Sequence, residues 1–302
     1  MLSRVWNSAW TLLVLTNLFW ASNIIVGRVV LNEVPAIALS FWRWTGAFTV
    51  ALWFAWPHLK RDWRALLDEW PLMIVLALTG IAFFNTAAYI GLAGTTALNV
   101  LLLQSCLPLI VMFWALVLFR ERPSLGQFAG IAISMAGVAF VAAHGSIDAL
   151  LTLNFHRADL WILAAATIYG IYVVLLRRRP DVHPLSFMQT AMGLGALMIA
   201  PFWFLDHAET RGAGWSWSSI GGIVYMAVFP SFIAYLFFNR GVQLIGSARA
   251  GQSTHLMPLF GGVMAVAFLE EEFHFYHIAG AVLVGSGIAL GQLTKPAPND
   301  ST

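Results

Sequence analysis

The chain has 302 residues, of which 60% are hydrophobic and only 10% are charged, and its formal net charge is +2. Soluble domains are typically about 45–50% apolar and about 25% charged, so this composition excludes an ordinary water-soluble domain. The basic residues are not gathered on one face, so no nucleic-acid partner is expected. A single cysteine, Cys106, excludes a disulfide within the chain.

Apolar stretches of roughly 20 residues recur along the sequence, and that is the length with which an α-helix crosses a bilayer. The first stretch is too long for a signal-peptide core and no small-residue cleavage site follows it, so it is expected to remain as a helix. The predicted transmembrane helices span residues 9–28, 35–56, 70–92, 96–118, 124–143, 158–177, 184–205, 215–238, 247–269 and 273–293. Because the loops are short, the sequence predicts an all-α integral membrane protein with residues 1–302 as one domain.

The second half of the chain resembles the first at an offset of 150 residues. Residues 84–139 align with residues 234–289 without a gap, and glycine, proline and glutamate recur at matched positions. The matched pairs include Gly91/Gly241, Pro108/Pro258, Leu109/Leu259, Glu121/Glu271, Gly130/Gly280 and Gly137/Gly287. The alignment predicts two five-helix repeats, residues 1–143 and residues 156–293.

The distribution of charge predicts how the helices are oriented. With the N-terminus in the cytoplasm, twelve of the sixteen basic residues fall in inner loops, as the positive-inside rule requires. Five helices per repeat is an odd number, so the second repeat must be inverted and both termini are expected in the cytoplasm. Inverted repeats of this kind build secondary transporters, in which the substrate binds near the midplane and access alternates between the two sides.

The motifs resemble the drug/metabolite transporter superfamily, and specifically its EamA family. They are Trp20-Ala21-Ser22-Asn23, Ser40-Phe41-Trp42-Arg43-Trp44, Leu107-Pro108-Leu109 and Arg120-Glu121-Arg122-Pro123-Ser124, followed in the second half by Gly246-Ser247-Ala248, Met257-Pro258-Leu259 and Glu271-Glu272. The resemblance implies a bacterial inner-membrane protein whose helices one, three, four, six, eight and nine surround a cavity. Within this family, the length and aromatic content are most similar to bacterial exporters of aromatic amino acids.

Polar side chains at membrane depth are candidates for a substrate site, because an unpaired polar group in hydrocarbon costs a few kcal/mol. The repeat pairs Gln104 with Thr254 and Ser105 with His255, one turn before the proline in each half. This helix face is predicted to line the cavity, although the same residues could instead bridge helices without contacting substrate. Pro108 and Pro258 are interpreted as gating hinges or as static kinks.

Tyrosine and tryptophan at inner depth could provide flat walls for a planar side chain. Packing between helices is the ordinary explanation for any one of them. Arg43 is interpreted as a structural charge or gate and not as a substrate ligand. The predicted cavity residues are Trp20, Asn23, Phe84, Asn85, Tyr89, Leu101, Gln104, Ser105, Trp161, Tyr169, Tyr225, Tyr235, Gly251, Thr254 and His255.

These features predict a monomeric exporter of aromatic and other large neutral amino acids that works in the lipid bilayer without a cofactor or metal. No Asp or Glu lies near the middle of a predicted helix, which favours uniport by alternating access. The alternative is an exporter of another small metabolite or drug, proton-coupled through His255. An enzyme is disfavoured because neither His-Glu-x-x-His nor Gly-x-Ser-x-Gly occurs, and a channel because no helix carries a continuous polar stripe.

Overall fold

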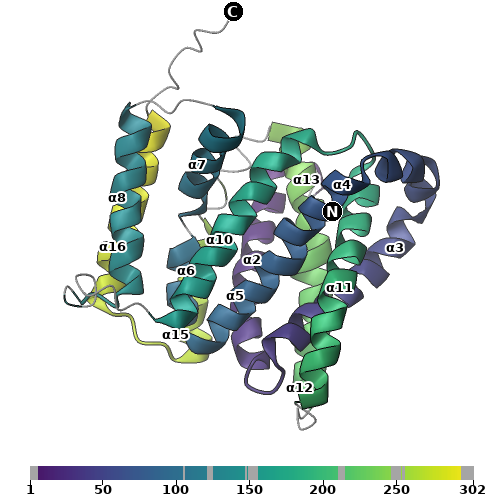
Figure 1. Ribbon diagram of the computed structural model, residues 1–302. Helices are drawn as coiled ribbons and strands as arrows, with labels where there is room; N and C mark the ends of the chain where they lie inside the picture. The colour runs from purple at the N-terminus through teal and green to yellow at the C-terminus, as the bar shows by residue number, and fades with distance from the viewer. Residues whose placement is uncertain are drawn as a thin grey trace, which may run out of the picture.

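The computed structural model describes residues 6–104, 106–120, 125–146, 148, 156–209, 215–245, 253 and 256–293. Within those residues the chain is helical, with short connections and no strand (Figure 1). The helices up to residue 142 are α2 (Ala9–Val30), α3 (Ala36–Asp68), α4 (Trp70–Ala77), the π-helix η1 (Leu78–Ala82), α5 (Phe83–Gly94), α6 (Ala97–Gln104), α7 (Leu107–Phe119) and α8 (Leu125–Ala142). They are followed by α10 (Arg157–Leu175), the 3₁₀ turn η2 (Leu176–Arg178), α11 (Pro184–Glu209), α12 (Trp217–Met226), the π-helix η3 (Ala227–Ile233), α13 (Ala234–Ile245), α15 (Leu256–Leu269) and α16 (Phe275–Leu293).

Five helical stretches of the described residues are long and apolar enough to cross a bilayer: Ala9–Val30, Trp70–Gly94, Arg157–Arg178, Pro184–Asp206 and Trp217–Ile245. The bent pair formed by α6 and α7 would make a sixth span, and shorter apolar helices lie at Phe128–Val141, Leu256–Leu269 and Phe275–Gly287. The all-helical membrane architecture is therefore confirmed. The count of ten spans stays a prediction.

The predicted helices at 35–56 and 96–118 differ most from the structure. The helix expected at 35–56 continues to Asp68, because the charged residues after Pro57 are compatible with a helix that leaves the apolar layer. The helix expected at 96–118 is divided into α6 and α7, whose axes differ by 40°. Pro108 consequently lies in the first turn of α7, where its missing N–H breaks no helical hydrogen bond.

The two π-helices occupy corresponding places in the two halves of the chain. Adding 150 to the bounds of η1 gives residues 228–232, which lie within η3. Each π-helix packs against the long helix of the other half, since α3 contacts η3 and α11 contacts η1. A π turn inserts an extra residue into the helix and is common at functional sites, so η1 and η3 are the irregular parts of otherwise regular spans.

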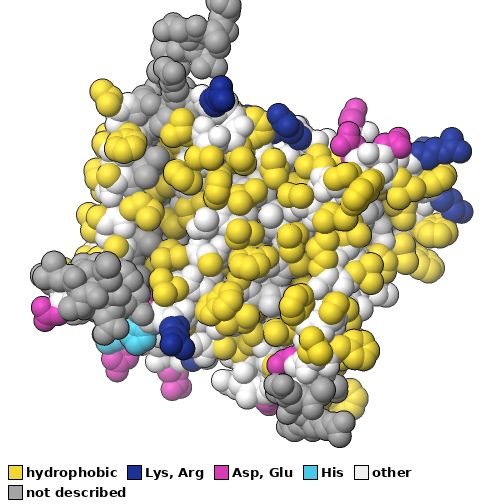
Figure 2. All heavy atoms as spheres, viewed as in Figure 1, with side chains coloured by type: hydrophobic (Ala, Val, Ile, Leu, Met, Phe, Trp, Pro, Cys, Tyr) yellow, Lys and Arg dark blue, Asp and Glu magenta, His cyan; other side chains and the backbone are white. Residues whose placement is uncertain are grey.

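Figure 1 shows α8 and α16 side by side at one edge of the bundle, α3 and α11 near the other edge, and α2, α5 and α10 between them. One buried apolar cluster joins α2, α5, α6 and α10, and includes Leu98, Leu101 and Ile162. A second cluster joins α3, α4 and α11, and includes Trp44 and Met192. Figure 2 shows that hydrophobic side chains cover most of the visible face and that charged groups gather at its upper and lower edges, as expected for a protein embedded in lipid.

Small residues allow α8 and α16 to approach closely. A Cβ atom at Gly137 would lie 3.0 Å from the Gly280 carbonyl oxygen, and one at Gly287 would lie 2.4 Å from the Gly130 carbonyl oxygen. The paired positions run in opposite directions along the two helices, so the pair is antiparallel. Gly130, Gly137, Gly280 and Gly287 thus serve packing within one chain, as small residues commonly do between membrane helices.

We expect Gly287→Ala to destabilise the protein by about 1–3 kcal/mol, because the added methyl group would also lie 2.2 Å from Ser134 Oγ and must push the two helices apart. Gly285→Ala is the matched control on the same helix, since a Cβ there has no neighbour within 4 Å. Thermal unfolding of the purified protein in detergent measures the difference. Equal melting temperatures for the two variants would contradict the close approach.

Candidate functional site

A buried arginine connects helices from both halves of the chain. Arg43 on α3 is only 3% exposed, and its Nε donates a hydrogen bond to Ser231 Oγ at 2.7 Å. Its Nη1 donates to Asn85 Oδ1 at 2.8 Å and to the Tyr89 hydroxyl at 2.5 Å. The Tyr89 hydroxyl in turn donates to Asn23 Oδ1 on α2 at 3.1 Å. We call these five side chains the Arg43 network.

The Arg43 network satisfies a charge that would otherwise be costly at this depth. Among the described residues no carboxylate pairs with Arg43, so neutral oxygens and aromatic rings surround the guanidinium group. Its carbon lies 4.7 Å from the centroid of the Trp44 ring and 5.7 Å from that of Tyr89. Cation–π contacts and several hydrogen bonds together replace hydration, which supports the interpretation of Arg43 as a structural charge.

An aromatic cluster lies along the same helices. Trp20 on α2 meets Tyr235 on α13 edge to face at a centroid distance of 5.7 Å, and its indole N–H donates to the Pro230 carbonyl oxygen at 3.2 Å. The ring centroids of Phe84 on α5 and Tyr169 on α10 are 4.2 Å apart. The side chains of Tyr169 and Tyr235 also interact electrostatically, which joins the two pairs. We call Trp20, Phe84, Tyr169 and Tyr235 the aromatic cluster.

The structure therefore brings together seven of the predicted cavity residues in two adjoining groups. Asn85 and Tyr89 are buried within the Arg43 network, whereas Asn23 and the four members of the aromatic cluster are half-buried. Tyr225 lies close by, because its hydroxyl is 2.7 Å from Ser22 Oγ, one residue before Asn23.

Three other predicted residues lie apart from these groups. Trp161 is 41% exposed, and it precedes Tyr169 on α10 by eight residues, or about 12 Å along a helix. Leu101 is buried against α15, where a Cβ at Gly261 would approach its side chain to 2.4 Å. Gln104 is the half-buried last residue of α6.

Several predicted positions fall outside the described residues, namely Ser105, Gly251, Thr254 and His255. The expected polar face of the ninth helix is thus untested. Pro258 is half-buried near the start of α15. The hinge role of Pro108 and Pro258 stays a prediction.

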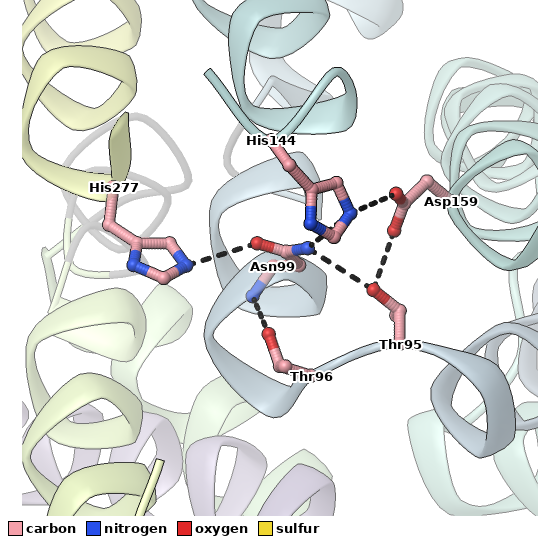
Figure 3. A network of polar contacts seen from close by, with 6 residues as sticks. All are labelled: Thr95, Thr96, Asn99, His144, Asp159 and His277. Carbon is pink, nitrogen blue, oxygen red and sulfur yellow. Dashed lines mark hydrogen bonds and ion pairs between the residues drawn. The ribbon is translucent and has the colours of Figure 1, made fainter. Parts of the chain in front are cut away.

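A second polar network, which the sequence did not predict as a group, lies at the ends of α6, α8, α10 and α16 (Figure 3). Asp159 is fully buried and accepts hydrogen bonds from Thr95 Oγ1 at 2.7 Å and from His144 Nε2 at 3.2 Å. Asn99, also fully buried, donates to Thr95 Oγ1 at 3.2 Å, and its Oδ1 lies 3.1 Å from His277 Nε2. Asp159 could have been noticed as an acidic residue in the first turn of a predicted span.

Two further carboxylates act at the same side of the bundle. Glu271 accepts hydrogen bonds from the backbone N–H groups of Ala97 and Leu98. Glu33 follows α2 and accepts hydrogen bonds from the hydroxyls of Ser216 and Ser219 at the start of α12. These hydroxyls, Ser216 first, lower the pKa of the Glu33 carboxyl below its ordinary value.

The side chains of this region could suggest a metal site, since histidines and carboxylates gather there. Among the described residues, however, no group of three or more His, Cys, Asp or Glu side chains is arranged to hold a metal ion. The contacts described above are instead hydrogen bonds that join helix ends.

A lipid-facing helical bundle whose centre combines a buried charge, amides and aromatic rings from both halves is typical of a multi-pass membrane transporter. The model of the EamA-like transporter family matches residues 7–143 and 156–291, so the chain belongs to this family. The resemblance deduced from the motifs is confirmed at the level of the family.

Known relatives agree with this assignment. The uncharacterized transporter YyaM of Bacillus subtilis is 29% identical over 229 residues, which cover 75% of each chain. A probable terminal-alkyne amino-acid exporter of Streptantibioticus cattleyicolor is 27% identical over 284 residues, covering 92% of this chain and 91% of the relative. A crystal structure that is 20% identical superposes with a TM-score of 0.63 over 95% of this chain and 96% of the other, which shows a shared fold.

We expect Arg43→Gln to lower the free energy of unfolding by roughly 3 kcal/mol, because Ser231, Asn85 and Tyr89 lose a charged donor inside the bundle. Arg64→Gln is the control, since Arg64 is exposed on the same helix and stacks on Trp63. Thermal unfolding in detergent compares the two. An Arg43 variant as stable as the Arg64 variant would show that the network is dispensable.

Proposed function

We propose that this protein exports aromatic and other large neutral amino acids from the cytoplasm across the bacterial inner membrane. The observation that carries the proposal is the aromatic cluster, which draws half-buried rings from α2, α5, α10 and α13. A planar apolar side chain gains most from offset or edge-to-face contact with such rings. The neighbouring amide of Asn23 adds a polar group that could orient the amino acid backbone.

Amino-acid export is also supported by one relative, the probable terminal-alkyne amino-acid exporter of Streptantibioticus cattleyicolor. The charge content of the site agrees with a zwitterionic cargo. Arg43 is the one basic side chain in the two central groups, and its Nε and Nη1 donors already bind Ser231, Asn85 and Tyr89, which disfavours a strongly anionic substrate. None of the residues in those groups carries a carboxylate, which disfavours a cationic drug.

We further propose that transport occurs by alternating access between two inverted five-helix repeats with both termini in the cytoplasm. Three observations support the repeat. The family model matches the chain twice, the π-helices lie 150 residues apart, and α8 pairs antiparallel with α16. Arg120 and Glu270, which are 150 residues apart and follow α7 and α15, also share the left-handed conformation, with φ of 57° and 55°.

For the energy source we favour uniport down a concentration gradient by a monomer. The buried Asp159 lies in the first turn of α10, at the end of the bundle and away from the aromatic cluster. The alternative is an EamA-type exporter of another small metabolite or drug that uses His255 as a proton carrier.

The cargo is tested by protection of cells against toxic analogues of phenylalanine, tyrosine and tryptophan. We expect expression of the wild-type chain to protect, and Tyr169→Ala to abolish protection because it removes the ring that contacts Phe84 and Tyr235. Trp161→Ala, on the same helix but exposed, is the control that should retain protection. Protection only against unrelated drugs would favour the alternative cargo.

Coupling is tested in proteoliposomes that contain the purified protein. We expect equilibration of radiolabelled phenylalanine without accumulation when a pH gradient alone is imposed, because no titratable group is found among the described residues of the two central groups apart from tyrosine and arginine. Uphill accumulation that disappears in His255→Ala would replace uniport with proton coupling.

A further inference from the structure

The carboxylate of Glu271 ties the start of α6 to the other half of the chain. Glu271 lies between α15 and α16, and its Oε1 accepts a hydrogen bond from the Ala97 N–H at 2.7 Å, while its Oε2 accepts one from the Leu98 N–H at 3.0 Å. The first N–H groups of an α-helix have no partner within the helix and carry partial positive charge. A carboxylate that receives two of them makes strong, charge-assisted bonds.

The same end of α6 is held at a second point. Asn99 lies two residues beyond Ala97 and contacts His277 of α16, and both side chains are at most 1% exposed. Below these polar contacts, α6 packs directly on α15. A Cβ at Gly261 would lie 2.4 Å from Leu101, and one at Gly262 would lie 3.8 Å from Leu98. Polar and apolar contacts together close this end of the interface between the halves.

We propose that Glu271 is the positioning residue of an outer latch, formed by Glu271 and the N–H groups of Ala97 and Leu98, which holds the outer side of the transporter closed. Opening toward the outside then requires both hydrogen bonds to break. This inference rests on the proposed transport by alternating access, but it does not depend on which cargo is carried.

The chemistry of the outer latch is specific to glutamate. Each of the two carboxylate oxygens accepts one N–H. Glutamine is uncharged and places an NH2 group, which cannot accept a hydrogen bond, where one of these oxygens lies. Glu270 turns the chain directly after α15 through its left-handed conformation, and the next residue therefore reverses toward α6. Glu272, by contrast, is 84% exposed and contacts only His274 at 3.7 Å.

The latch is tested with a single cysteine at position 262, in a Cys106→Ser background. A cysteine is sterically tolerated there, because a Cβ at Gly262 meets only Leu98 Cδ2 at an ordinary contact distance. Cells expressing the protein are treated from outside with a membrane-impermeant maleimide. We expect slow labelling with Glu271 present and labelling about tenfold faster in Glu271→Gln, the change expected for the loss of one charge-assisted hydrogen bond. Glu272→Gln is the matched control and should label slowly.

A second variant alters the other side of the latch. Ala97→Pro removes one N–H donor, and proline is tolerated in the first turn of a helix. It should accelerate labelling while Glu271 stays in place. Thermal unfolding of each variant excludes general loss of structure as the cause of any acceleration.

Two results would overturn the latch. The first is that Glu271→Gln and Ala97→Pro, although folded, are labelled no faster than the single-cysteine protein with Glu271 and Ala97 in place. The second is that Glu272→Gln accelerates labelling as much as Glu271→Gln does. Labelling needs no substrate, so it is independent of the cargo. Faster labelling in a protein that gives no protection against aromatic analogues would refute the cargo and retain the latch. Normal protection with no change in the labelling rate would refute the latch and retain the cargo.

Discussion

The constraint on which this structure depends is that a lipid interior offers no water to backbone N–H and C=O groups. Every departure from a regular helix must therefore find a partner within the protein. The break between α6 and α7 illustrates this, because it places Pro108 in a first turn that needs no intrahelical donor. At the other end of α6, the exposed donors are satisfied by the hydroxyl of Thr96 and the carboxylate of Glu271.

The same constraint explains why the buried charged side chains Arg43 and Asp159 lie within hydrogen-bond networks. Arg43 is surrounded by Ser231, Asn85 and Tyr89, and Asp159 by Thr95 and His144. Each group draws its members from several helices, so each network specifies how those helices are placed as well as satisfying its own atoms. A transporter that moves its halves relative to each other must rearrange such contacts, and the position of a network indicates which helix ends are restrained in this conformation.

The sequence was sufficient to predict the all-helical membrane fold and the family, because apolar length and motif order are local signals. It also placed Trp20, Phe84, Tyr169 and Tyr235 at a common depth. It did not predict the interruption at Cys106, the π-helices or the extension of α3 to Asp68, since these depend on neighbours that become available only in the folded bundle. Depth along a helix does not determine which face of the helix is turned inward. Trp161, which the sequence places among the cavity residues because of its depth, is therefore exposed in the structure.

The offset of 150 residues also has a geometric meaning in the packed structure. A residue can contact its own counterpart only where the two-fold axis that relates the predicted repeats passes between them. Ser134 donates to the Val284 carbonyl oxygen at 3.0 Å, and these two residues are 150 apart. The axis would therefore pass between α8 and α16, at the edge of the bundle. Counterpart positions can still differ in composition, as Asn85 and Tyr235 do.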